Sequence, residues 1–307
     1  RRSHPSSATM VAMRPLLITI LLGVCAVPAA AQDLDRDGLA DAFEQALLER
    51  FTPSIKLDSR ECDVAPASFA AGVRDPFVVA RDGTLYGQAF RVGDANGRVQ
   101  VELHFYHLWQ RDCGRPSHDL DAEHVSAIVS ATSLSAPASE WKADAWYAAA
   151  HEDTVCDASS GASAITLHAE AAGPQVFVSR GKHASYLDRG QCKWGCGSDV
   201  CDGGRPLAIA KVVNIGEVDA PLNGADWIHS RRWALADKMR SDFDPSTRAS
   251  LDGTNHIVSL MLHRRPLQSP ILAGDTALDG LSTAARSTGR ALDTARRHVS
   301  KFLRLKN

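Results

Sequence analysis

The chain has 307 residues, with 34 Lys or Arg against 36 Asp or Glu, and 44% of its residues are apolar. This composition is that of an ordinary globular protein, and it excludes a collagen-like chain, a disordered chain and a dedicated nucleic-acid binder. The length provides enough residues to bury a core in one large domain or two small ones.

Residues 1–31 have the pattern of a secretory signal peptide. Met13-Arg14 precede the apolar run 16–31, which ends in three alanines and is shorter than the roughly 20 residues that a membrane span needs. The pattern predicts cleavage after Ala31 and a secreted or periplasmic location, with residues 1–12 as an over-extended start. Cleavage would leave 31 basic and 36 acidic residues, a net charge of −5.

Six cysteines remain once Cys25 is removed with the signal peptide. An even number in an exported chain predicts three disulfides, and the sequence leaves their pairing open. The last three cysteines are closely spaced and could alternatively bind zinc. An oxidising compartment and the lack of a C-x2-C element favour disulfides. The six are Cys62, Cys113, Cys156, Cys192, Cys196 and Cys201.

Residues 33–44, DLDRDGLADAFE, have the twelve-residue spacing of an EF-hand-type calcium loop. Hard oxygen ligands on alternate residues, a Gly at position 6 and a closing Glu at position 12 are the pattern that Ca²⁺ prefers. A helix is predicted over 41–51, so that residues 32–55 form a loop and helix with a structural ion. The alternative is an acid-rich helix N-terminus favoured by the helix dipole. The predicted ligands are Asp33, Asp35, Asp37, Asp41 and Glu44.

The middle of the chain has the period-two alternation of β-strands. Apolar residues alternate with polar ones from Val99 to Phe105, which predicts a strand with one buried face, joined to residues 88–92 by a hairpin turn at 94–97. Without a βαβ rhythm, the pattern predicts a mainly β fold over 56–270, an antiparallel β-sandwich with peripheral helices. Further strands are predicted over 125–131, 145–150, 175–179, 207–215 and 257–263, and a second helix over 227–241.

Residues 271–307 differ in composition from the rest of the chain. They are rich in Ala, Leu and Arg, and their apolar residues fall on one side of a helix. A basic amphipathic tail of this kind is either solvated or in peripheral contact with an anionic membrane surface.

Residues 112–125, DCGRPSHDLDAEHV, contain a second candidate ion site. His118, Asp121 and Glu123 form H-x-x-D-x-E, a ligand set whose carboxylates favour Ca²⁺ or Mg²⁺ over zinc. Asp121 and Glu123 are two residues apart, so they face the same side of a strand that enters at Val125. His118 is expected to reach back from the preceding loop. A solvated polar loop is the alternative.

The string HDLDAEHV resembles the H-x-x-D-W-E-H-V signature of secreted necrosis- and ethylene-inducing proteins and of the vacuolar protein sorting-associated protein 62-like family. Residues 176–186, VFVSRGKHASY, resemble a strand-then-G-x-H-A-S-Y segment of the second family. Together with residues 146–152, the similarity covers roughly residues 100–190. Ala122 stands where the signature has Trp, and the GHRH lead-in of the toxins is absent, so the chain resembles the second family more.

The resemblance implies a single β-sandwich and a divalent cation used in membrane-lipid recognition rather than in turnover. It implies that His118, Asp121 and Glu123 are ligands of that cation, with Asp112 as a candidate fourth. His151 and His183 each follow an apolar strand and are further candidates for ligand binding.

These observations predict a divalent-cation-dependent binding protein for a glycan or lipid headgroup rather than an enzyme. The G-x-S-x-G, H-E-x-x-H and P-loop patterns are absent, which weakens the commonest hydrolase and nucleotide-binding interpretations. One alternative is a metal-dependent, phosphoesterase-like hydrolase with His124 or His183 as acid or base. The other is a structural envelope protein without a substrate. The oligomeric state is left open.

Overall fold

The structure is a computed structural model that describes residues 32–114, 117–152, 154, 156–195, 199–217, 219–234, 239, 243, 245–251 and 256–260. The predicted signal peptide (1–31), the predicted basic tail (271–307) and Cys196 lie outside these described residues.

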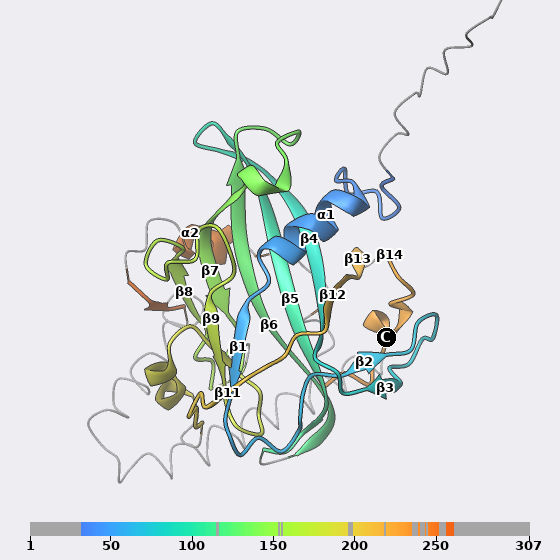
Figure 1. Ribbon diagram of the computed structural model, residues 1–307, viewed down its shortest axis with the longest axis vertical. Helices are drawn as coiled ribbons and strands as arrows, with labels where there is room; N and C mark the ends of the chain where they lie inside the picture. Colours follow the sequence, from blue (N-terminus) through green and yellow to red (C-terminus); the bar gives the residue numbers. More distant parts are fainter. Residues whose placement is uncertain are drawn as a thin grey trace, which may run out of the picture. The chain divides into compact units, whose positions relative to one another are not determined.

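A seven-stranded sheet dominates the described residues (Figure 1), with the strand order β12-β4-β5-β6-β7-β8-β15. All neighbouring strands run antiparallel except β12, which is parallel to β4. The β4–β5 hairpin turns at Asn96 and Gly97, whose φ angles of 52° and 72° are those of a tight two-residue turn. The strands are β4 (Thr84–Ala95), β5 (Arg98–Asp112), β6 (His118–Ala131), β7 (Lys142–Ala148), β8 (Ser160–Ser163), β12 (Lys211–Asn214) and β15 (Val258–Ser259).

A four-stranded sheet packs against it, in the order β10-β9-β1-β11. Its residues Ile55 and Val176 belong to the same buried cluster as Phe105 and Trp146 of the larger sheet, so the two sheets share one core, as in a β-sandwich. This confirms the predicted mainly β fold. The strands are β1 (Ser54–Leu57), β9 (Gln175–Val178), β10 (Ser185–Tyr186) and β11 (Arg205–Pro206).

Two strand pairs depart from the antiparallel arrangement, because β1 pairs with β9 and β12 pairs with β4 in parallel. More than a hundred residues separate the two strands of each pair. Connections of this length allow a chain to return in the same direction, whereas a short hairpin imposes antiparallel pairing.

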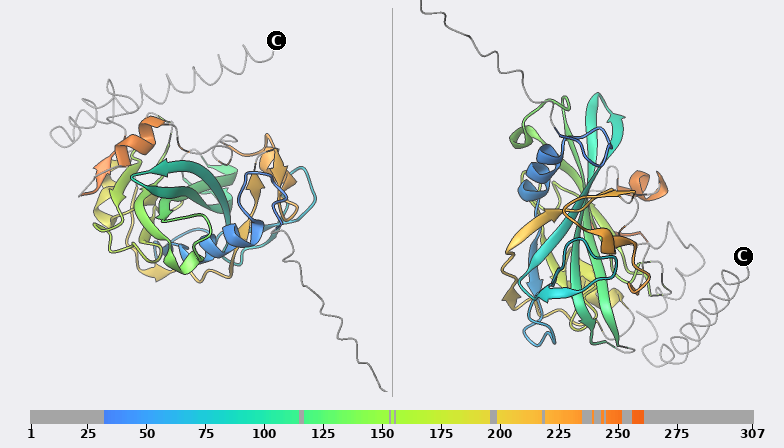
Figure 2. Two further views of the ribbon diagram at one scale, coloured as in Figure 1. Left: turned by 90° about the horizontal axis from the view of Figure 1, so that it is seen from above. Right: turned by 90° about the vertical axis from the view of Figure 1, so that its right-hand side faces the viewer.

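Helices α1 (Asp41–Arg50) and α2 (Pro245–Leu251) lie on opposite faces of the larger sheet (Figure 2). Leu47 and Leu48 of α1 join the cluster that contains Val129, whereas Leu251 of α2 packs with Ile128, as the alternation of side chains along a strand requires. The helix predicted over 41–51 is confirmed. Among the described residues, no helix is both long and apolar enough to cross a membrane.

Smaller elements complete the fold. Two short hairpins are β2 (Ser68–Phe69) with β3 (Val78–Ala80) and β13 (Gly216–Glu217) with β14 (Ala220–Pro221). Three 3₁₀ helices are η1 (Ala138–Glu140), η2 (Arg189–Trp194) and η3 (Asp226–His229).

The prediction of a helix over 227–241 is wrong for the described residues of that range. Residues 226–229 form the short η3, residues 231–234 form turns and a bend, and 235–238 and 240–242 lie outside the described residues. Trp227 and Trp233 are buried against Phe69, and the indole N–H of Trp233 donates to the carbonyl of Trp227 (3.0 Å). The spacing of the tryptophans therefore reflects one aromatic cluster and not a helix face.

The predicted strands are present with different limits. The strand predicted from Val125 begins at His118, because β5 and β6 pair continuously from Val99–Ala131 to Asp112–His118. The motif H-x-x-D-x-E therefore lies in a strand, and the expectation that His118 belongs to a preceding loop is corrected. Strands β7, β9, β12 and β15 lie within, or overlap, the ranges predicted for them.

Candidate functional site

The acidic loop, residues 33–44, turns back on itself before α1. The carboxylate of Asp33 accepts hydrogen bonds from the backbone N–H groups of Arg36 (2.7 Å) and Gly38 (3.2 Å). Gly38 has a φ of 90°, which glycine adopts readily and other residues do not. The sharp turn thus occurs at position 6 of the predicted calcium loop.

The turn brings the predicted calcium ligands together. Ligand oxygens of Asp33, Asp35 and Asp37 lie within 4.8 Å of one another, and so do those of Asp35, Asp41 and Glu44. Asp35 belongs to both groups, so the other four carboxylates surround it. A small volume enclosed by hard oxygen atoms is the ligand geometry of Ca²⁺ sites in proteins.

The most buried carboxylates of the acidic loop are poorly compensated within the described part of the chain. Asp35 is 6% exposed, and neither of its carboxylate oxygens has a hydrogen-bond partner among the described residues. Burial, followed by the charge of Asp37, raises the pKa of Asp35 to about 6. Burial and the charges of Asp35 and Asp37 raise the pKa of Glu44 to about 9. Buried carboxylates need a proton, a hydrogen bond or a cation, and this donor set fits a divalent cation.

The central cluster is defined here as Glu61, Asp112, His118, Asp121, Glu123 and His183. Its surface part lies where β5 ends and β6 begins, because Asp112 and His118 face each other across the two strands. Nε2 of His118 lies 3.3 Å from a carboxylate oxygen of Asp112, and the His118 side chain is 37% exposed. The hydrogen bond with Asp112 raises the pKa of His118 to about 9; burial opposes the shift and the charge of Asp121 adds to it.

Behind this pair, His183 bridges two carboxylates in the interior. Nδ1 of His183 lies 3.0 Å from Asp121 and Nε2 lies 3.5 Å from Glu61, and Trp109 stacks on the imidazole at 4.0 Å. Burial alone would lower the pKa of His183, but the hydrogen bond to Asp121 and the neighbouring Glu61 carboxylate raise it to about 9. His183 therefore lies between the two carboxylates and holds that of Asp121 in place.

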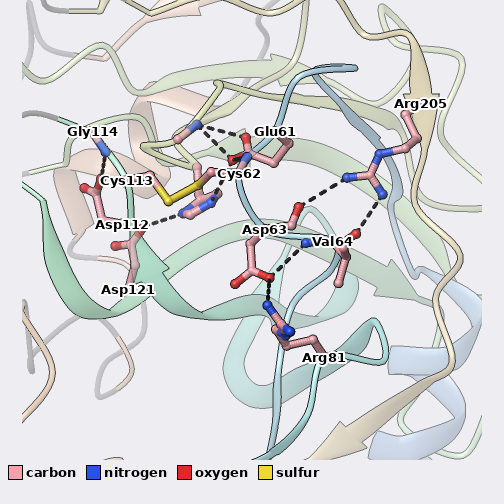
Figure 3. Close-up of a disulfide and its surroundings, with 12 residues drawn as sticks. Glu61, Cys62, Asp63, Val64, Arg81, Asp112, Cys113, Gly114, Asp121 and Arg205 are labelled. Atoms are coloured by element: carbon pink, nitrogen blue, oxygen red, sulfur yellow. Dashed lines mark hydrogen bonds and ion pairs between the residues drawn. A yellow bond between two sulfur atoms is a disulfide. The ribbon is translucent and has the colours of Figure 1, made fainter.

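A disulfide fixes Glu61 in this position (Figure 3). Cys62 is bonded to Cys113, directly after Asp112, and Glu61 accepts a hydrogen bond from the backbone N–H of Gly181 (2.9 Å). Burial would raise the pKa of Glu61, but His183 and Gly181 stabilise the carboxylate and lower it. The cross-link thus joins the segment before β2 to the end of β5.

Glu123 and His124 lie deeper along β6 than Asp121. Glu123 is 4% exposed and stands opposite His107 of β5. The side chain of His124 is 5% exposed and lies 3.7 Å from Glu152. The four sequence-predicted ligands of the central site therefore extend from the half-exposed His118 into the interior.

His151 belongs to a different group, centred on Asp199. The buried carboxylate of Asp199 lies 2.6 Å from Nε2 of His151 and 2.8 Å from Nζ of Lys182, and it also accepts from the Tyr186 hydroxyl. Burial would raise the pKa of Asp199, but His151 and Lys182 hold it well below its usual range. The structure therefore separates His151 from His183, which contacts Asp121 and Glu61.

Three residues in or next to the central cluster and the Asp199 group have a left-handed backbone conformation. Leu120, His151 and His183 have φ angles of 59°, 53° and 57°, in a region that costs energy for residues other than glycine. Such conformations persist only where the surrounding contacts impose them, and they concentrate at functional sites.

The cysteines form disulfides, as predicted. Cys62–Cys113 and Cys192–Cys201 are paired, and Cys156 is also disulfide-bonded. The pairing of Cys192 with Cys201 excludes the alternative in which the last three cysteines hold zinc.

Sequence reasoning missed Glu61, Trp109 and Asp199. Glu61 and Asp199 each stand close to a cysteine, but only the pairing, which the sequence leaves open, shows where those segments lie. Trp109 continues the alternation of β5 beyond Phe105, and a longer predicted strand would have placed it beside the motif.

A groove of about 700 Å³ lies beside the acidic loop. Helix α1 and the edge strand β12 both contribute residues to its lining. Residues of the acidic loop and of β12 that line it include Leu34, Asp41, Lys211, Val212, Val213 and Asn214.

No protein-family model and no curated protein matches the chain. A solved structure described as "Toxin fold for microbial attack and plant defense" is 15% identical, with a TM-score of 0.37, covering 74% of this chain and 94% of that one. "NLPPya in complex with glucosamine" is 16% identical, with a TM-score of 0.35 and coverage of 74% and 94%.

A third similar structure is Necrosis and Ethylene inducing Protein 2 from the causal agent of cocoa's Witches Broom disease. It is 14% identical, with a TM-score of 0.33, and the alignment covers 73% of this chain and 97% of that one. The resemblance to the vacuolar protein sorting-associated protein 62-like family finds no support, and no family is assigned.

Proposed function

We propose that the chain is an exported, divalent-cation-dependent binding protein that recognises the polar headgroup of a glycan or lipid at the central cluster. The observation that carries the proposal is the half-exposed His118, which contacts Asp112 and lies within the electrostatic reach of Asp121. An imidazole and two carboxylates are a ligand set that suits Ca²⁺ or Mg²⁺ and can leave coordination sites for ligand oxygens.

Buried contacts support a pre-organised site. His183 fixes the Asp121 carboxylate from behind, and Glu61 fixes His183. Groups of this kind, which orient a ligand residue without touching the metal, strengthen metal binding. Glu123 would complete the set from the interior, as the spacing of the motif predicts.

The positions of two histidines favour binding over hydrolysis. A general acid or base must reach the reacting group by hydrogen bonding. His124 and His183, which the hydrolase alternative requires, have side chains that are 5% and 0% exposed, and each lies beside a carboxylate. Neither is placed to exchange a proton with a ligand at the surface.

The acidic loop has a structural role in this proposal, as a Ca²⁺ site that fastens the segment before α1. Its support is Asp35, a buried carboxylate with two oxygens that lack partners among the described residues. The disulfides support an oxidising, exported location.

Metal content and titration calorimetry of residues 32–307 test the two sites separately. We expect two ions in the wild-type protein, one lost in His118→Ala and in Asp112→Asn, and the other lost in Asp37→Asn. His168→Asn, which changes an exposed histidine in a turn, is the matched control and should keep both ions. A protein in which His118→Ala and Asp112→Asn retain every ion would contradict the central site.

Vesicle sedimentation tests the ligand. Phosphatidylcholine vesicles doped with phosphatidylinositol or with a glycosphingolipid should retain the protein with Ca²⁺ or Mg²⁺ present and release it in EDTA. The His118→Ala variant should not sediment, whereas His168→Asn should behave as wild type. Retention that is equal in EDTA would refute cation-dependent recognition.

A further inference from the structure

Glu44, the last position of the acidic loop, has a partner far away in the sequence. Its Oε2 accepts a hydrogen bond of 2.9 Å from the side-chain Nδ2 of Asn214, 170 residues further along the chain. Glu44 is 1% exposed and Asn214 is 2% exposed. Water therefore competes little for this contact, which ties the loop to the end of β12.

The Asn214 side chain has one orientation only. Its Oδ1 accepts from the backbone N–H of Gly216 (3.0 Å), and since that group is a donor, the amide oxygen must face it and the NH₂ group must face Glu44. The backbone of Asn214 is held too, because its N–H donates to Gln45 and its carbonyl accepts from Asn223.

Gly216, two residues after Asn214, lies close to Asp35 at position 3 of the acidic loop. Gly216 has a φ of 63°, and a Cβ added there would lie 3.0 Å from Oδ2 of Asp35 and 2.6 Å from Leu222. A side chain at 216 would therefore press on the loop. Residues 214–216 lie against both Asp35 and Glu44, the two most buried acids of the predicted calcium site.

We propose that Asn214 is a positioning residue of the calcium site, which orients the Glu44 carboxylate for the ion and couples ion binding to the β12–β13 segment. The inference rests on the proposed calcium site. Asp35, 6% exposed and without hydrogen-bond partners for either carboxylate oxygen among the described residues, points independently to a cation there. Asn214 donates to one oxygen of Glu44 and leaves lone pairs on both oxygens for the ion.

Calcium titration of Asn214→Leu tests the proposal. The substitution keeps the volume and removes the donor, and loss of such an orienting hydrogen bond lowers metal affinity by about 10- to 100-fold. Gln100→Leu is the matched control, because it likewise removes a side-chain amide that donates to a carboxylate, here that of Asp144 (3.3 Å) and not that of Glu44. The control should change the calcium Kd by less than about twofold, whereas Asn214→Leu should raise it by at least about tenfold.

A second measurement uses the wild-type protein and does not depend on how well a variant folds. In an NMR titration with Ca²⁺, the side-chain NH₂ signals of Asn214 should shift in step with the loop amides. Hydrogen exchange of residues 211–217 should slow on calcium addition in the wild type and less in Asn214→Leu.

The outcomes separate the two proposals. A wild-type protein that binds no Ca²⁺ through residues 33–44 overturns both the calcium site and the role of Asn214. The positioning role alone is overturned if the wild-type protein binds Ca²⁺ and the Asn214 NH₂ signals do not shift. It is also overturned if the calcium affinity of Asn214→Leu is within twofold of wild type.

Discussion

The disulfide Cys62–Cys113 gives the sharpest stability prediction. Its cysteines are 51 residues apart in sequence, so the bond removes much conformational freedom from the unfolded chain. Loop-closure entropy assigns about 4 kcal/mol to a loop of this length at 25 °C. Both cysteines are exposed, so replacing them with Ser removes little packing, and the double variant Cys62→Ser/Cys113→Ser should lose most of that amount.

Urea unfolding followed by tryptophan fluorescence measures both stability and the m value. The double variant should show a lower free energy of unfolding and a larger m value, because its unfolded chain is less compact. The control is Cys192→Ser/Cys201→Ser, whose cysteines are only nine residues apart; its m value should match wild type. A loss below about 1 kcal/mol with an unchanged m value would refute the entropic argument.

Two charge substitutions have equally defined outcomes. The low pKa of Asp199 in the folded state stabilises the protein above the unfolded-state pKa of about 4, and this stability is lost as the pH falls further. Asp199→Asn should therefore flatten the loss of stability below pH 4 in acid unfolding, and an unchanged acid limb would contradict the assignment. Glu102 is fully buried, with His104 at 2.6 Å and Arg248 at 3.0 Å. Glu102→Gln should lower the unfolding free energy in urea by about 3–5 kcal/mol, whereas the exposed Glu140→Gln should be neutral; equal effects would refute the role of the buried charge.

Local patterns determined much of the fold. Alternation of apolar residues predicted β5, the Asn96-Gly97 pair predicted its hairpin, and the acids around Gly38 predicted a loop that brings five carboxylates together. These features depend on backbone preferences and on neighbours within a few residues, so the sequence is sufficient to define them. The even number of cysteines likewise predicted disulfides without their pairing.

Only the tertiary structure brought the distant partners together. Asp121 meets His183 across 62 residues, and Glu44 meets Asn214 across 170. The burial of Trp227 and Trp233 in one cluster overrode a helical spacing. These contacts depend on which strands pair and which faces are buried, and such choices are made by the free energy of the whole core. A local pattern carries no record of them, because the partners share no stretch of sequence.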